Sequence, residues 1–157
     1  MKLILFLSLP LYVLDQITKF LVLAYIPTHV TIEVIPGFFN LVQVHNTGAA
    51  FGMLKDNNWF FIGLASVALV VLAVMARRGC FLDTATRLGA ALLASGVIGN
   101  LTDRILHGYV VDFLDVILPW YGHWPAFNVA DSCICVAAGL FLVSAFFTPK
   151  SEDKPTS

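Results

Sequence analysis

Long apolar stretches separated by polar connections dominate the chain, and four of them are long enough to cross a lipid bilayer. They cover about residues 3–24, 59–76, 88–105 and 129–147, close to the roughly 20 mostly apolar residues that a transmembrane helix requires. The third stretch is the least clear. The first contains Asp15 and Lys19 and lacks a small-x-small cleavage site, so we interpret it as a retained span rather than a signal peptide.

The connections between these stretches carry β-strand and interface patterns. Two β-prone runs, Thr31 to Ile35 and Phe39 to Val44, flank Pro36-Gly37, which favours a small hairpin on the membrane surface. Residues 110–115 are apolar except for two aspartates and can dip into the interface. We therefore expect an all-α membrane protein with four transmembrane helices, a small β-sheet region and a short amphipathic segment on the outer face.

Basic side chains set the expected orientation of the chain. Lys and Arg favour the cytoplasmic side of a membrane, and most of those outside the spans share one side: Lys2, Arg77, Arg78, Arg87, Lys150 and Lys154. Lys55 and Arg104 lie on the other side. Both termini are therefore expected in the cytoplasm. We expect one domain over residues 1–150 and a disordered cytoplasmic tail over residues 151–157.

Composition agrees with a lipid environment and disfavours several classes of function. Hydrophobic residues make up 59% of the 157 residues and charged residues 12%, far from the balance of soluble proteins. With a formal net charge of -1, the chain lacks the excess of Lys and Arg that binding to nucleic acid requires. The three cysteines suit neither a disulfide framework nor a metal cluster, and the chain contains no HExxH or GxSxG motif. We expect no metal and no serine nucleophile.

Polar side chains gather in the outer half of the spans once this orientation is applied. They end the third span, open the fourth, lie beyond the midpoint of the first and occur in the loop between the last two. The layer contains Asp15, Lys19, Asn100, Asp103, Arg104, Asp112, Asp115, Asn128 and Asp131. Ionisable groups at membrane depth are costly unless they are paired or hydrated, so by default they indicate function.

Several members of this layer also have a purely structural interpretation. Asp15 and Lys19 are spaced i, i+4 and can neutralise one another on a helix. Asp103 and Arg104 are neighbours and can form an ion pair at the end of the third span.

The other polar residues of this layer differ in how well a purely structural role explains them. Asn128 and Asp131 suit an N-cap and its third residue, and Asp115 fits an exposed loop acid, which is the interpretation we favour. Asp112 is harder to explain, because its apolar neighbours offer no charge partner. Two carboxylates held close together share one proton, so one can activate water while the other hydrogen-bonds the carbonyl under attack. Such a pair would hydrolyse a peptide bond.

Five short motifs follow one another along the chain. They are Asp15-Gln16-Ile17-Thr18-Lys19 (D-x-x-x-K), Asn46-Thr47-Gly48-Ala49-Ala50-Phe51-Gly52 (N-T-G-A-A-F-G), Gly99-Asn100-Leu101-Thr102-Asp103-Arg104 (G-N-x-x-D-R), Val110-Val111-Asp112-Phe113 (V-V-D-F) and Phe127-Asn128-Val129-Ala130-Asp131 (F-N-x-A-D). In this order and topology they resemble the motifs of the lipoprotein signal peptidases, or signal peptidase II, which are aspartic peptidases of bacterial inner membranes. One departure is Ser95, where many members carry Gly.

The resemblance implies a division of labour among these residues. Asp112 and Asp131 would be the catalytic dyad. The surrounding shell, which binds substrate or holds the acids, would contain Asp15, Asn46, Gly48, Asn100, Asp103, Arg104 and Asn128. Gly48 would allow a close backbone approach, although a plain turn fits equally well.

The resemblance also implies a substrate and a location. The substrate would be a diacylglyceryl-modified prolipoprotein, cut just before its lipid-modified cysteine, and no cofactor is implied. The chain would be a multi-pass protein of the bacterial plasma (inner) membrane, surrounded by membrane lipid, with its active site on the periplasmic side. Its oligomeric state is open and compatible with a monomer.

Two other functions fit fewer of the sequence features. A small proton-coupled transporter would use an intramembrane acid such as Asp15. Transporters often carry internal repeats and acids near the midplane, whereas the acids of this chain cluster toward one side and no internal repeat is apparent. A noncatalytic scaffold would bind a partner through its outer sheet and would place no demand on Asp112 or Asp131.

Overall fold

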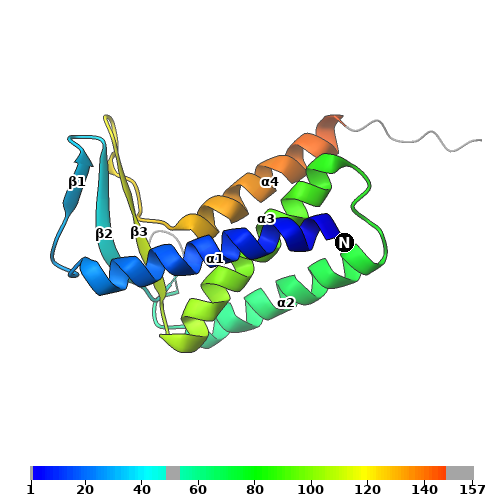
Figure 1. The fold of residues 1–157 in the computed structure, drawn as a ribbon, viewed down its shortest axis with the longest axis horizontal. Coiled ribbons are helices and arrows are strands. Elements are labelled where there is room, and N and C mark those ends of the chain that lie inside the picture. Colours follow the sequence, from blue (N-terminus) through cyan, green and yellow to red (C-terminus); the bar gives the residue numbers. More distant parts are fainter. Residues whose placement is uncertain (1, 49–53, 148–157) are drawn as a thin grey trace, which may run out of the picture.

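The chain folds into an elongated helical bundle with a β-sheet at one end. The structure is a computed structural model that describes residues 2–48 and 54–147, so the predicted tail over residues 151–157 lies outside the described residues. The elements in chain order are α1 (Lys2–Tyr25), β1 (Ile32–Ile35), β2 (Phe39–Asn46), α2 (Asn58–Arg77), α3 (Thr84–Leu106), β3 (Val110–Leu118), β4 (Gly122–His123) and α4 (Val129–Phe147). The N-terminus and the end of α4 lie at the end of the bundle far from the sheet (Figure 1).

Three helices in the described part of the chain are long and apolar enough to cross a membrane. They are Phe6–Tyr25, Asn58–Arg77 and Val129–Phe146, which correspond to the first, second and fourth predicted spans. Helix α3 is equally long but more polar, and it packs against α1, α2 and α4. A helix covered by its neighbours presents little surface to lipid, so its sequence tolerates more polar and small residues.

Helix α3 begins at Thr84, before the predicted start at residue 88. The reason is an N-cap: the Asp83 carboxylate accepts a hydrogen bond from the backbone N–H of Thr86 at 2.9 Å. This cap satisfies a free N–H group of the first turn, where apolar periodicity gives no signal.

Small residues on α3 allow its close approach to α4 and α1. A Cβ atom at Gly96 would overlap the backbone oxygen of Ala130 and lie 2.7 Å from Cγ1 of Ile134, and a Cβ atom at Gly99 would lie 2.6 Å from a carboxylate oxygen of Asp15. Close backbone approach through small residues is the usual basis of helix packing in membranes. These glycines therefore bring the polar residues of three helices within reach of one another.

The four described strands form one antiparallel sheet in the order β1-β2-β3-β4. The predicted hairpin is confirmed: β1 pairs with β2, and Gly37 in the turn between them has a φ of +70°, which glycine adopts without strain. The segment expected to dip into the interface is strand β3, which pairs with β2 along most of its length.

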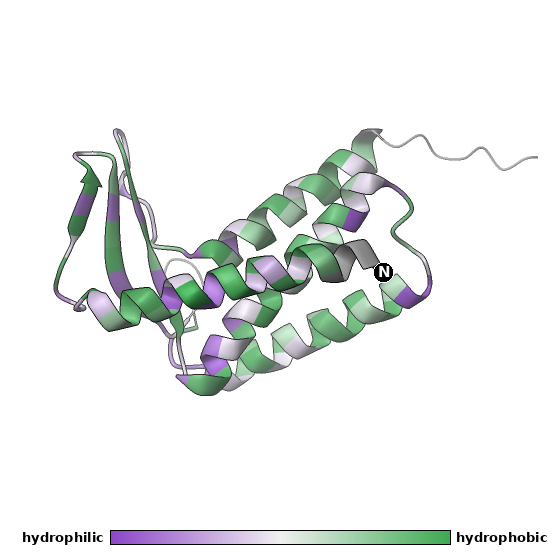
Figure 2. Ribbon diagram, viewed as in Figure 1, coloured by the Kyte–Doolittle hydropathy of each residue, from purple (hydrophilic) through white to green (hydrophobic). Residues whose placement is uncertain are grey.

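The sheet packs on the end of α1. Val22 and Ile26 of α1 form a buried cluster with Val111 and Phe113 of β3. Figure 2 shows that the hydrophilic positions of α1 lie close to the sheet, while most of its other turns are hydrophobic. The polar layer expected from the sequence thus lies where the bundle meets the sheet.

The close packing of α3 on α4 gives a stability prediction. The Gly96→Ala variant is expected to lose about 1–3 kcal/mol of unfolding free energy, because the added methyl group overpacks the contact. Gly139→Ala is the matched control, since nothing lies within 4 Å of a Cβ atom at Gly139. Thermal unfolding in detergent measures both variants, and an equal Tm for the two would contradict this account of the packing.

Candidate active site

Asp112 and Asp131 open into the same cavity, which has a volume of about 920 Å³. Asp112 comes from β3 and is 1% exposed, whereas Asp131 lies in the first turn of α4. Six of the nine predicted site residues line this cavity: Asn46, Gly48, Asn100, Arg104, Asp112 and Asp131. The other three, Asp15, Asp103 and Asn128, are buried directly behind it. The structure therefore brings all nine together.

The Asp112 carboxylate accepts one hydrogen bond on each oxygen. The side-chain amide of Asn46 donates to Oδ2 at 2.8 Å, and that of Asn128 donates to Oδ1 at 2.7 Å. Burial, followed by the nearby charge of Asp131, raises the pKa of Asp112 to about 7, against the opposing effect of these amides. Near neutral pH, Asp112 therefore exchanges a proton readily.

The Asp131 carboxylate is held by Asn100 and Asn128. Nδ2 of Asn100 donates to Oδ1 of Asp131 at 2.7 Å. The backbone N–H of Asn128 donates to Oδ2 at 3.3 Å, and the Asn128 side-chain oxygen accepts from the Asp131 backbone N–H at 2.8 Å. This reciprocal arrangement is a capping box, so the N-cap interpretation is confirmed. Asn128 has a second role besides capping, because its side-chain amide also donates to Asp112.

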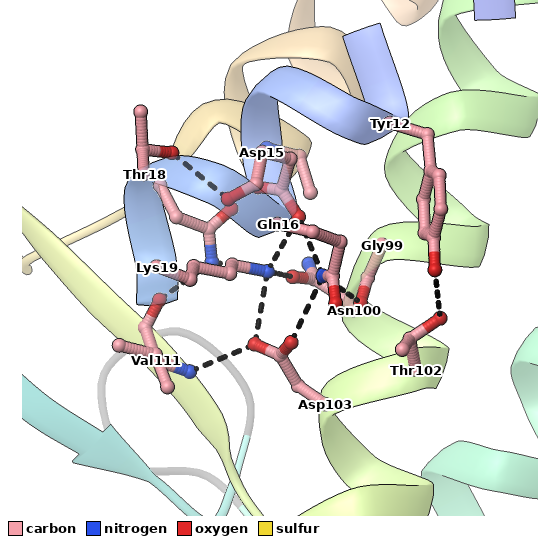
Figure 3. A network of polar contacts seen from close by, with 12 residues as sticks. Tyr12, Asp15, Gln16, Thr18, Lys19, Gly99, Asn100, Thr102, Asp103 and Val111 are labelled. Atoms are coloured by element: carbon pink, nitrogen blue, oxygen red, sulfur yellow. Dashed lines mark hydrogen bonds and ion pairs between the residues drawn. The ribbon is translucent and has the colours of Figure 1, made fainter. Parts of the chain in front are cut away.

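A buried ion cluster centred on Lys19 (Figure 3) is connected to Asp131 through Asn100. The Lys19 ammonium lies 2.9 Å from Oδ2 of Asp15 and 2.9 Å from Oδ2 of Asp103. The expected pairing of Asp15 with Lys19 is confirmed. Asp103, however, forms its ion pair across to α1 rather than with its neighbour Arg104, because its side chain points into the bundle.

The ion cluster is also connected to the rest of the fold. Oδ1 of Asp15 accepts the backbone N–H of Ala130 at 2.8 Å, and Oδ2 of Asp103 accepts that of Val111 at 3.1 Å. Gln16 bridges the two acids, donating to Asp15 at 3.2 Å and to Asp103 at 3.1 Å. Gln16 was missed as a site residue, although a polar side chain inside an apolar span was an available signal.

Arg104 connects the helices to the outer loop. Its Nη2 donates to the backbone oxygen of Gly48 at 3.0 Å, and its guanidinium lies 4.7 Å from the ring centroid of Phe61. The backbone N–H of Gly48 donates to Oδ1 of Asn46 at 3.0 Å, which is the contact of an Asx-turn. The turn interpretation of Gly48 is therefore supported, while motif residues 49–52 lie outside the described residues.

The prediction that Asp115 is an exposed loop acid was wrong. Asp115 is 5% exposed, because the pairing of β2 with β3 sets it opposite Asn40. The Asn40 amide donates to its carboxylate at 2.8 Å, and the His123 ring lies 2.8 Å from the same carboxylate oxygen. Asp115 does not line the cavity of the two other acids and stays outside the candidate site.

One wall of the cavity is apolar. It includes Phe127 and a run of α4 residues, Ile134, Cys135 and Val136, and Val136 is 53% exposed on the surface of that helix. Among the residues that the structure describes, no group of three or more His, Cys, Asp or Glu side chains is arranged to hold a metal ion. The arrangement can therefore supply paired carboxylates beside a surface suited to an apolar ligand.

Comparison with known proteins relates this geometry to a family. The sequence profile of the family described as Signal peptidase (SPase) II matches residues 7–147. A lipoprotein signal peptidase from Symbiobacterium thermophilum is 44% identical over 132 residues, covering 83% of this chain and 86% of the relative. The lipoprotein signal peptidase from Syntrophotalea carbinolica is 48% identical over 134 residues, covering 83% and 82%.

Solved structures agree with the sequence relatives. A bacterial membrane enzyme superposes with a TM-score of 0.87 at 28% identity, covering 98% of this chain and 94% of its own. A second superposes with a TM-score of 0.83 at 29% identity, covering 93% and 94%. Because the profile match spans nearly all of the described helices and strands, the chain belongs to the signal peptidase II family.

Proposed function

We propose that the chain is an intramembrane aspartic endopeptidase that removes signal peptides from diacylglyceryl-modified prolipoproteins. It cleaves just before the lipid-modified cysteine and uses Asp112 and Asp131 as its catalytic dyad. The observation that supports this most directly is the shared cavity, into which the two carboxylates open from separate elements. Each carboxylate is held by amide donors, which fixes its orientation toward a bound peptide.

Hydrolysis by this pair follows from the state of its protons. Asp112, with a pKa of about 7, carries the shared proton and hydrogen-bonds the scissile carbonyl. Ionised Asp131 removes a proton from water as the water oxygen attacks the carbonyl carbon. The resulting tetrahedral diol then collapses: the C–N bond breaks, the leaving nitrogen takes the proton from Asp131, one diol hydroxyl returns its proton to Asp112, and a carboxylic acid and an amine are released.

The supporting residues hold the two carboxylates in position. Asn46, Asn100 and Asn128 supply the donors, and Arg104 positions the Asn46–Gly48 turn beside the cavity. Asp15 and Asp103 act indirectly, by pairing with Lys19 and accepting backbone N–H groups. No cofactor is needed for these steps.

The apolar wall supports a lipid-modified substrate. It continues from the dyad to exposed Val136 on α4, and exposed surface on a membrane-spanning helix faces lipid. Acyl chains attached to the substrate cysteine would therefore remain in the bilayer while the scissile bond reaches the two acids.

The same proposal assigns a topology. Helices α1, α2, α3 and α4 are four spans of the bacterial inner membrane, with both termini in the cytoplasm. The sheet and the cavity then lie on the periplasmic side, which agrees with their position at the end of the bundle away from the N-terminus (Figure 1). Within the described residues, nothing specifically favours a transporter.

The dyad assignment predicts the effect of removing either acid. Asp112→Asn and Asp131→Asn are each expected to lower kcat by at least about 10³-fold, because neither amide can exchange the shared proton. Asp56→Asn, in the exposed outer loop, is the matched control and should cleave normally. The assay follows cleavage of a lipid-modified prolipoprotein in detergent, with Tm confirming that each variant is folded. Normal cleavage by either dyad variant would refute the assignment.

The pKa of Asp112 predicts the pH dependence of cleavage. Below about pH 7 Asp112 holds its proton, and above this pH it loses it, so kcat should fall as the pH rises through neutrality. A pH–rate profile measures this fall, with Tm at each pH separating titration from unfolding. A rate that keeps rising well above neutrality would show that the protonated form is not the active one.

The apolar wall predicts selectivity for the lipid. A peptide whose cysteine carries diacylglycerol should have a kcat/KM at least about 10²-fold higher than the same peptide with a free cysteine, because the acyl chains hold that cysteine in the lipid phase beside the apolar wall, and transfer of each acyl CH₂ from water to lipid contributes about 0.8 kcal/mol. Both peptides are assayed at equal concentration in the same micelles. Equal kcat/KM values would instead indicate a general signal peptidase.

A further inference from the structure

Lys19 is buried and does not line the cavity. Its ammonium group nevertheless has a partner for each of its N–H groups. Its Nζ lies 2.9 Å from Asp15, 2.9 Å from Asp103 and 3.0 Å from Oδ1 of Asn100 (Figure 3). The side chain is 2% exposed. An ammonium group has three N–H donors and no acceptor, so these three partners use all of its hydrogens.

The contact with Lys19 decides which way the Asn100 amide faces. A carboxamide has a donor end and an acceptor end that are alike in shape, and its orientation is set by its hydrogen-bond partners. Because Lys19 can only donate, Asn100 turns its oxygen toward Lys19. Its Nδ2 then faces Asp131 and donates to Oδ1 at 2.7 Å.

The same orientation is passed on to Asn128. Oδ1 of Asn100 also accepts from Nδ2 of Asn128 at 3.2 Å, and this Nδ2 donates to Oδ1 of Asp112 at 2.7 Å. With Nδ2 so placed, the Asn128 oxygen is left to accept the backbone N–H of Asp131. A reversed Asn100 amide would set oxygen against the Asp131 carboxylate and N–H groups against Lys19 and Asn128.

We propose that Lys19 is a positioning residue for peptide cleavage. Lys19 acts through Asn100 and fixes the direction of the hydrogen bonds that reach Asp131 and Asp112. Lys19 thereby ensures that each carboxylate of the dyad receives an N–H donor. This inference rests on the proposed function of the two acids and extends it to a cation that does not touch substrate.

The charge of Lys19 also acts on the dyad. It lowers the pKa of Asp112, in opposition to burial and to the charge of Asp131. The described titratable and charged groups in the cavity and the adjoining network, from every neighbouring element, are Asp15 and Lys19 of α1, His45 of β2, Lys55 of the outer loop, Asp103 and Arg104 of α3, and Asp131, Cys133 and Cys135 of α4. Loss of Lys19 alone therefore leaves an excess of negative charge near Asp112.

Two variants separate the donor role of Lys19 from its charge. Lys19→Met removes both the donor and the charge. Lys19→Gln combined with Asp103→Asn replaces one cation and two anions by a single anion, so the net charge of the cluster stays the same. The introduced amides can both donate and accept, which removes the constraint on the orientation of Asn100.

The full-length chain in detergent is assayed with a lipid-modified prolipoprotein for kcat, KM and the pH–rate profile. Both variants are expected to lose on the order of 10²-fold in kcat with little change in KM, as for a misplaced catalytic group. The fall in rate at high pH should move up by about one pH unit in Lys19→Met and return toward the parent value in the charge-balanced variant. Full kcat in a folded charge-balanced variant would overturn the inference, because charge balance alone would then explain Lys19.

Two further variants keep the test decisive. If neither Lys19 variant folds, Asn100→Asp replaces the Nδ2 donor by oxygen at constant shape: a kcat loss on the order of 10²-fold supports the inference, and full activity overturns it. Asp131→Asn is assayed in parallel. Activity in Asp131→Asn would refute the proposed function itself, whereas an inactive Asp131→Asn beside fully active Lys19 variants would refute only the role of Lys19.

Discussion

A buried ammonium group flanked by two carboxylates holds the bundle together at the depth where the spans carry their polar residues. Burying such charges is unfavourable unless every hydrogen bond is made, and the contacts of Lys19 with Asp15, Asp103 and Asn100 meet this requirement. The requirement constrains the backbone as well, because a Cβ atom at Gly99 would come within 2.6 Å of an Asp15 oxygen. The ion cluster therefore requires α1 and α3 to approach each other closely at Gly99.

The cluster in turn positions two elements that would otherwise be independent. Asp15 accepts a backbone N–H at the start of α4, and Asp103 accepts one from β3. These are the elements that carry Asp131 and Asp112, so hydrogen bonds from the ion cluster bring together the two acids of the proposed dyad. The resulting site is hydrogen-bonded on its polar side and apolar along α4, a combination suited to holding a peptide bond at a lipid–water boundary.

Much of this arrangement could be predicted from the sequence, because the signals were local. Pro36-Gly37 between β-prone runs predicted the hairpin, and the spacing of Asp15 and Lys19 predicted their ion pair. The burial of Asp115 could not be predicted, since its partner Asn40 lies 75 residues away and meets it only through sheet pairing. Strand β3 also gave no alternating pattern, because its residues from Val110 to Phe113 are all buried, and such a run resembles any buried segment.

The location of the shared proton tests the central claim most directly. Infrared difference spectroscopy can follow the C=O stretch of a protonated carboxyl group as the pH is raised. The account predicts a band that disappears as the pH passes through about 7, the pKa of Asp112, and that is absent from the Asp112→Asn variant, because this variant lacks the carboxyl group that titrates there. A band that persists unchanged in Asp112→Asn, or the lack of any band in the parent protein below neutral pH, would contradict the account.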